Sequence, residues 1–198
     1  NIEGKLGYYC LANETSISKG TIEAAYESAK VALTAVEMLQ SDKSIFALCR
    51  PPGHHASMDQ YGGYCFFNNA AIAAEKLIEK GAKKIFILDI DFHHGNGTQK
   101  IFYNRSDVFF ASLHGDPLEA FPHFLGHSDE KGNGLGKGYN LNYPMPPNTN
   151  YNQWKKFLNK AVSEVKNFSP DFLLISLGVD TFENDPISFF KLKSEDYF

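Results

Sequence analysis

Two aspartates and two histidines follow an apolar run in the middle of the chain. The run begins at Ile85 and leads into Asp89, Asp91, His93 and His94. Such groups at the end of a buried strand must be paired or ligated, because an unpaired buried charge is very costly. If the strand continues, Asp89, Asp91 and His93 share one face, since alternate strand residues point the same way. Two carboxylates and an imidazole together are typical of a divalent-metal site.

A third candidate ligand follows another apolar run. Residues 172–177 are largely apolar, and Asp180 comes soon after them. We therefore take Asp91, His93 and Asp180 as the metal ligands, because three protein ligands leave coordination open, as in catalytic sites. This donor set suits Zn²⁺, and Fe²⁺ or Co²⁺ would also fit. An ordinary hydrogen-bonded turn would account for Asp91 and His93 by themselves, so the prediction of a metal site depends on Asp180.

A histidine pair, His54 and His55, follows the loop sequence Arg50-Pro-Pro-Gly53. Hydrolysis by a metal-activated water needs a base for the water and an acid for the leaving group, and imidazoles can serve as both. Each imidazole also needs an orienting partner on its other nitrogen, and Asp89 and Asn96 are candidates. A carboxylate raises the pKa of an imidazole and an amide does not, so the two histidines should differ electrostatically.

Helices and strands alternate along the chain. Periodicity predicts helices over about 18–40, 69–80 and 152–167, with a short helix over 98–103. Apolar runs predict strands over 45–49, from 85, and over 108–114, 139–145 and 172–178, whereas 1–17 and 115–138 are expected to be irregular. This order predicts an α/β fold with a mainly parallel sheet, whose ligands bind beyond the carboxyl ends of the strands.

Composition narrows the class of protein. The 198 residues carry 19 basic and 23 acidic side chains, a net charge of -4 that offers no footprint for nucleic acid. No apolar run approaches the ~20 residues that span a bilayer, and no secretory signal opens the chain. Cys10, Cys49 and Cys65 indicate free thiols in a reducing compartment, the cytoplasm. The stretch 132–138 lacks the Ser or Thr of a phosphate loop and is interpreted as a flexible connection.

Four motifs resemble the histone deacetylase superfamily: Arg50–Ala56, Gly63–Asn69, Leu88–Gly97 and Ser176–Asp180. Two longer stretches, Ser112–Gly126 and Asp180–Phe190, look most like bacterial acetylpolyamine amidohydrolases. The resemblance implies a three-layer α/β/α arginase/deacetylase fold, with 1–198 as one catalytic domain that lacks the family's first and last portions.

The resemblance also implies roles for single residues. Asp91, His93 and Asp180 would hold one zinc, and His54 and His55 would be the catalytic pair, with Asp89 and Asn96 behind them. Gly63, Tyr64 and Phe121 would flank a tunnel for the acetylated arm of a small amine, with acetylpolyamines favoured. A homodimer is compatible with the family. K⁺ is expected at two sites, the first near Asp89, Asp91, His93, Ser112 and Leu113, and the second near Phe102, Arg105, Val108 and Tyr139.

Two departures keep alternatives open. The strictest deacetylase pattern has Asp at the position of Asn96, and the family's Gly-Gly-Tyr segment, whose tyrosine polarises the acetyl carbonyl, does not occur before Phe198. A protein lysine deacetylase and a catalytically silent metal-binding module therefore remain alternatives. A two-metal ureohydrolase is a further one, although it would need His54 or His94 as an additional ligand.

Overall fold

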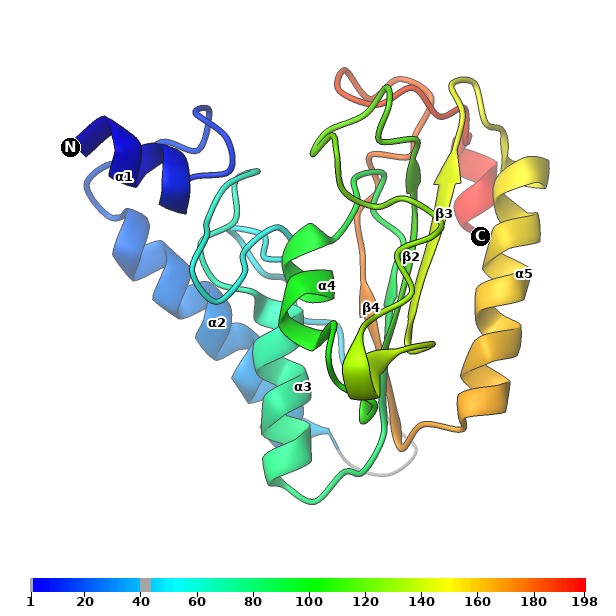
Figure 1. Cartoon of the computed structure of the whole chain (residues 1–198), viewed down its shortest axis with the longest axis horizontal. Coiled ribbons are helices and arrows are strands. Elements are labelled where there is room, and N and C mark those ends of the chain that lie inside the picture. Colours follow the sequence, from blue (N-terminus) through cyan, green and yellow to red (C-terminus); the bar gives the residue numbers. More distant parts are fainter. Residues whose placement is uncertain (1, 40–43) are drawn as a thin grey trace. The chain divides into compact units, whose positions relative to one another are not determined.

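The structure is a computed structural model that describes residues 2–39 and 44–198. The chain forms two compact units (Figure 1). The first comprises Asn1–Ala82 and Asn96–Ile101, and the second Lys83–Gly95 and Phe102–Phe198. The single-domain interpretation stays a prediction. Among the described residues, no helix is both long and apolar enough to cross a membrane.

The second unit is built on a four-stranded sheet in the order β3-β2-β1-β4. The strands are β1 (Ile85–Asp89), β2 (Val108–Gly115), β3 (Asn140–Met145) and β4 (Phe172–Ser176). All three pairings are parallel, and they align Ile85 with Val108 and with Phe172. The α/β class with a parallel sheet is therefore confirmed. Every residue of β1 and β2 is buried, as continuous apolar runs in parallel sheets usually are.

Helix α5 (Tyr151–Phe168) packs against β1 and β2 (Figure 1). Its start is fixed by a capping box, in which Asn150 and Gln153 each accept a hydrogen bond from the other's backbone N–H. Trp154, Ala161 and Phe168 lie on its buried face and join the core. The stacked rings of Phe86 and Phe109, with centroids 4.8 Å apart, lie in the same core.

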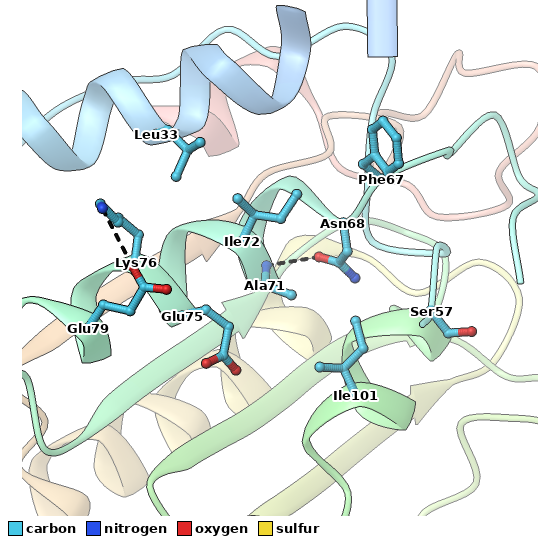
Figure 2. A pocket seen from close by; sticks show the side chains of 10 residues that line it. All are labelled: Leu33, Ser57, Phe67, Asn68, Ala71, Ile72, Glu75, Lys76, Glu79 and Ile101. Atoms are coloured by element: carbon cyan, nitrogen blue, oxygen red, sulfur yellow. Dashed lines mark hydrogen bonds and ion pairs between the residues drawn. The ribbon is translucent and has the colours of Figure 1, made fainter. Parts of the chain in front are cut away.

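The first unit contains α1 (Ile2–Tyr9), α2 (Thr21–Met38), α3 (Asn69–Glu79) and most of α4 (Asn96–Phe102). Helices α2 and α3 pack together, and Asn68 caps α3 by accepting a hydrogen bond from Ala71 N at 3.0 Å. The predicted helix over 69–80 is confirmed, and Gly81 after it takes a left-handed φ of 107°, as glycines that follow a helix commonly do. Figure 2 shows an open groove on this unit that Leu33, Ile72 and Ile101 help to line.

Two local predictions are wrong. The start of the chain is not irregular, because residues 2–9 form α1 despite Gly4 and Gly7. Tyr61 holds the end of this helix, since its N donates to Tyr9 O and its O accepts from Leu11 N. Tertiary contacts here override a low helix propensity. Residues 45–49 form no strand, and Phe46 and Leu48 are exposed. A strand requires a neighbouring strand for its backbone hydrogen bonds, and the described sheet offers none to this segment.

Two further predictions about loops need correction. Strand β1 ends at Asp89, so Asp91 and His93 do not share a strand face; they lie in the turn that follows. The stretch 132–138 is not a free connection, because Asn133 N donates to Tyr103 O at 2.8 Å. A Cβ atom on Gly136 would lie 2.6 Å from Arg105 N, so the backbone approaches closely there and requires glycine.

Candidate metal centre and histidine pair

Three candidate ligands gather at the carboxyl ends of β1 and β4. One ligand atom from each of Asp91, His93 and Asp180 lies within 4.8 Å of the others. The imidazole Nδ1 of His93 lies 3.1 Å from Asp91 Oδ1 and 2.8 Å from Asp180 Oδ2. Strands β1 and β4 are parallel neighbours, so the residues that follow them meet at the same edge of the sheet.

Backbone N–H groups orient the two carboxylates. Asp91 Oδ1 accepts from His93 N at 2.8 Å, and Asp180 Oδ1 accepts from Phe92 N at 2.9 Å. Asp89 makes the same kind of contact as Asp91, with the N–H two residues later: Asp89 Oδ1 accepts from Asp91 N at 3.2 Å. Short acidic side chains commonly stabilise turns in this way. The sequence Asp-Ile-Asp-Phe-His therefore forms its own rigid turn.

Gly178 leaves room for the cluster. A Cβ atom there would fall on the Asp91 carboxylate and 2.8 Å from Asp180 Oδ1. Any larger residue would push the two carboxylates apart. The backbone of the Ser176–Asp180 motif thus lies directly against the candidate ligands.

The two carboxylates favour a positive charge on His93, whose Nδ1 lies near both of them. Burial lowers the pKa of His93, but hydrogen bonds to Asp180 and Asp91 and their charges outweigh burial and raise it to about 9. Burial raises the pKa of Asp180, and the nearby charge of Asp91 adds to that effect. Two carboxylates that compete for one positive group are a donor set that suits a divalent metal ion. The residues present therefore fit such an ion.

The histidine pair lies in the first unit with one of its predicted partners. His55 Nδ1 lies 2.6 Å from Asn96 Oδ1, while Asn96 Nδ2 donates to His55 O at 3.4 Å. An amide oxygen only accepts, so Nδ1 carries the hydrogen, and a neutral His55 ring has its lone pair on Nε2. Both histidines are buried, with ring centroids 4.1 Å apart. The start of α4 holds the pair, because Gly97 N donates to His54 O at 3.0 Å.

Gly63 adjoins the same histidine, and Tyr64 follows it in the chain. Gly63 has a φ of 53°, and a Cβ atom there would lie 2.8 Å from His55 Cγ, so the ring rests on the bare backbone. Tyr64 takes a left-handed φ of 64°, its N donates to Thr15 Oγ1 at 2.9 Å, and its side chain is half exposed. Of the residues expected to flank a tunnel, Gly63 is therefore in contact with the predicted catalytic His55.

Phe121 adjoins the metal cluster instead. Its ring centroid lies 6.2 Å from that of His93, with the two rings at 68°. The predicted site residues accordingly fall into two groups. The first unit holds His54, His55, Gly63, Tyr64 and Asn96, and the second holds Asp89, Asp91, His93, Phe121 and Asp180.

The residues expected near potassium form two groups within the second unit. Asp89 and Ser112 are aligned partners of β1 and β2, and both are fully buried. In the other group, Arg105 N donates to Phe102 O at 2.9 Å and the Arg105 guanidinium pairs with Asp107 at 2.6 Å. That either group binds a cation stays a prediction.

The sequence did not identify Gly178 as part of the cluster, nor Asn142 and Gly126 as neighbours of the buried His94 and His114. Glycines inside the matched motifs were a usable signal for Gly178, since a glycine next to a ligand often marks close backbone approach. The other contacts join residues far apart in the chain, and their spacing gives no sign of them. The groove of Figure 2 contains none of the predicted site residues.

Comparison with known proteins identifies the family. The family model described as "Histone deacetylase domain" matches residues 3–198. Acetylpolyamine amidohydrolase of Mycoplana ramosa is 59% identical over 198 residues, which are 100% of this chain and 58% of that protein. Acetylpolyamine amidohydrolase 2 of Pseudomonas aeruginosa is 53% identical with the same coverage. The chain thus spans little more than half the length of these relatives.

Comparison with solved structures identifies the same family. The acetylpolyamine aminohydrolase from Burkholderia pseudomallei superposes with a TM-score of 0.85 at 43% identity, covering 88% of this chain and 51% of that one. A histone deacetylase homologue from Aquifex aeolicus gives a TM-score of 0.88 at 35% identity, covering 96% and 51%. The predicted resemblance is confirmed. The chain belongs to the histone deacetylase domain family.

Proposed function

We propose that the complete gene product is a metal-dependent amidohydrolase that removes the acetyl group from acetylated amines, with acetylpolyamines as preferred substrates. The Asp91–His93–Asp180 cluster carries the proposal, because three convergent donors beside a buried strand end match an open catalytic metal site. The relatives at 53% and 59% identity support the substrate class, since both are named acetylpolyamine amidohydrolases.

The three cluster residues would hold the metal, with Zn²⁺ favoured and Fe²⁺ or Co²⁺ as alternatives. When bound, such an ion supplies Lewis-acid polarisation of the acetyl carbonyl and lowers the pKa of a water molecule. His93 must first give up the proton that it shares with Asp91 and Asp180. The backbone N–H groups of Phe92 and His93 keep the two carboxylates oriented during this exchange.

The histidine pair would move the protons. His55 is assigned as the general acid/base, because Asn96 holds Nδ1–H and leaves the Nε2 lone pair as the basic position. The ring would accept a proton at Nε2 from the attacking water and return it to the leaving amine. His54, whose ring lies 4.1 Å from that of His55, would act electrostatically. Gly63, Tyr64 and Phe121 would bind the apolar arm of the substrate.

The proposal is tested by measuring how fast the zinc-loaded gene product hydrolyses N-acetylputrescine and an acetyl-lysine peptide. We expect faster turnover of N-acetylputrescine. We also expect Asp180→Asn to lose zinc and at least ~100-fold of the activity, because one of three ligands is removed. Asp129→Asn, the same change at an exposed loop position, should keep both.

Each contrary outcome has a separate meaning. Faster turnover of the peptide would replace the polyamine assignment with that of a protein lysine deacetylase. Bound zinc without turnover of either substrate would favour a silent metal-binding module. Close to two zinc ions per chain would favour the two-metal alternative.

A further inference from the structure

A buried polar network links β2 to the loop that carries Phe121. His114 and Ser112 on β2, Asn142 on β3, and His94 in the turn after β1 are each at most 2% exposed. Burying so many polar groups is costly unless their hydrogen bonds are made, so a network of this kind fixes geometry where it occurs. The active-site chemistry proposed above uses neither His114 nor His94.

His114 is held at both ring nitrogens. Its Nε2 lies 2.8 Å from Gly126 O, and its Nδ1 lies 2.8 Å from Ser112 Oγ. A carbonyl oxygen only accepts, so Nε2 carries a hydrogen and donates it to Gly126. In the neutral ring, Nδ1 then accepts from the Ser112 hydroxyl. One tautomer of His114 therefore connects the strand to the loop.

Glu130 holds Gly126 from its other side. The carboxylate oxygens of Glu130 each accept from Gly126 N at 3.1 Å, and one accepts from His127 N at 3.1 Å. Asn142 completes this anchor by donating to His127 O at 3.2 Å. The peptide groups on both sides of Gly126 are thus bound to groups outside the segment 116–126.

Gly126 itself lies directly against two imidazole rings. It has a φ of 99°, and a Cβ atom there would lie 2.7 Å from His94 Cγ and 2.8 Å from His114 Nε2. The two rings have centroids 4.6 Å apart. Only glycine combines this backbone conformation with this approach.

The segment 116–126 is also fixed where it begins. Asp116 N donates to Met145 O at 2.8 Å, and Gly115 N donates to Phe92 O at 2.8 Å. Phe121 lies midway between these two anchors, beside His93. A displacement at Gly126 would therefore move one end of the short span that places Phe121.

We propose that His114 is a positioning residue, which, by binding Gly126, holds Phe121 beside the candidate metal ligands and so sets the affinity for the substrate's acetylated arm. The effect on affinity depends on the proposed function, whereas the anchoring of segment 116–126 does not. The metal ligands should be little affected, because Asp91 and Asp180 are oriented by the N–H groups of His93 and Phe92.

The test compares substitutions at His114 in the zinc-loaded gene product. His114→Leu removes both hydrogen bonds, and we expect KM for N-acetylputrescine to rise about tenfold with kcat within about twofold. His114→Gln keeps a donor near the position of Nε2 and should restore most of the loss. The matched control is His127→Gln, because His127 joins the network through its backbone.

Amide hydrogen exchange gives a readout that is independent of activity. His114→Leu should speed exchange in 116–126 about tenfold or more while leaving β1 unchanged. If His114→Leu does not fold, Gly126→Ala tests the same anchor from the loop side. Should the wild type hydrolyse no acetylated amine, the proposed function fails, and exchange still decides whether His114 anchors the segment.

Three results would overturn the proposal. The first is unchanged exchange in 116–126. The second is equally faster exchange in β1, which would make His114 an ordinary core residue. The third, in an active enzyme, is faster loop exchange with an unchanged KM.

Discussion

At the scale of single residues, the side chains of the candidate ligands are held by hydrogen bonds from the backbone of the turn after β1. Asp89 and Asp91 each accept the N–H of the residue two positions on, and Asp180 accepts the N–H of Phe92. These contacts hold two carboxylates near one imidazole, and a positive group between the carboxylates stabilises this arrangement. In the metal-free chain that group is the His93 proton; a metal ion would replace it.

The charge of His93 predicts how the stability of metal-free protein depends on pH. Hydrogen bonds to Asp180 and Asp91 overcome burial and raise the folded-state pKa of His93 to about 9, against 6.5 for an ordinary histidine. A raised pKa contributes stability that is complete below pH 6.5 and lost as the pH rises through about 9. We expect the free energy of unfolding to fall between pH 7 and 9.5 by about 3 kcal/mol at most.

Urea unfolding of the chelator-treated gene product at several pH values measures this loss. His93→Gln should remove most of the pH dependence, because it lacks the titrating ring, whereas His127→Gln should follow the wild type. A wild-type curve that is flat from pH 7 to 9.5, or one that His93→Gln leaves unchanged, would show that the cluster does not hold this proton.

Residue identity was the predictable part of the site. Asp91, His93 and Asp180 were identified because few other residue types bind metals and because each follows an apolar run. Their geometry was predicted for the wrong reason, since the strand ends before Asp91 and the turn brings the groups together. The contact between Asn96 and His55 was expected without a decision on which histidine is involved, because sequence does not show which ring lies nearer.

At the scale of elements, α5 shows how a short local signal sets a boundary. Asn150 and Gln153 form its capping box, with hydrogen bonds of 3.0 and 3.1 Å. We expect Asn150→Ala to lower the free energy of unfolding by about 1 kcal/mol, because the first turn loses a partner for one of its N–H groups. Asn152 is exposed and lies two residues further along the same first turn, so Asn152→Ala should alter the free energy of unfolding by less than about 0.5 kcal/mol.

Chemical unfolding of both variants at one pH distinguishes the cap from general helix propensity. Equal stabilities for Asn150→Ala and Asn152→Ala would mean that the capping box adds nothing to the stability of α5.

Elements with strong local signals were predicted to within a few residues. Helices α3 and α5 have a capping asparagine and a clear apolar stripe, and β2 is a continuous apolar run. The failures are elements whose state depends on distant partners. Helix α1 depends on contacts around Tyr61, and residues 45–49 are apolar enough for a strand but lack a strand neighbour in the described sheet.

At the scale of the whole molecule, the parallel sheet was predictable because strands and helices alternate, and a parallel connection needs a crossover. The strand order was not. The apolar run at 172–178 predicted a strand but not its place in the sheet, and β4 lies at the edge of the described sheet. Four apolar side chains in or just after this strand are 44–62% exposed, namely those of Leu173, Ile175, Leu177 and Val179.

An apolar edge strand predicts how the 198-residue chain behaves when it is expressed by itself. Unpaired N–H and C=O groups beside exposed apolar side chains favour pairing with another chain. We expect the isolated chain to self-associate as its concentration rises, and Ile175→Lys to reduce this, because a charge on an edge strand opposes strand addition. Ile187→Lys is the matched control, since Ile187 is 56% exposed, against 55% for Ile175, but lies in a loop.

Sedimentation velocity over a range of concentrations measures the association. If β4 is the contact, Ile175→Lys shifts the distribution toward monomer and Ile187→Lys does not. Equal effects of the two lysines would mean that added charge, rather than the strand edge, controls association. A chain that stays monomeric at every concentration would contradict the prediction and show that this five-residue apolar edge strand does not drive association.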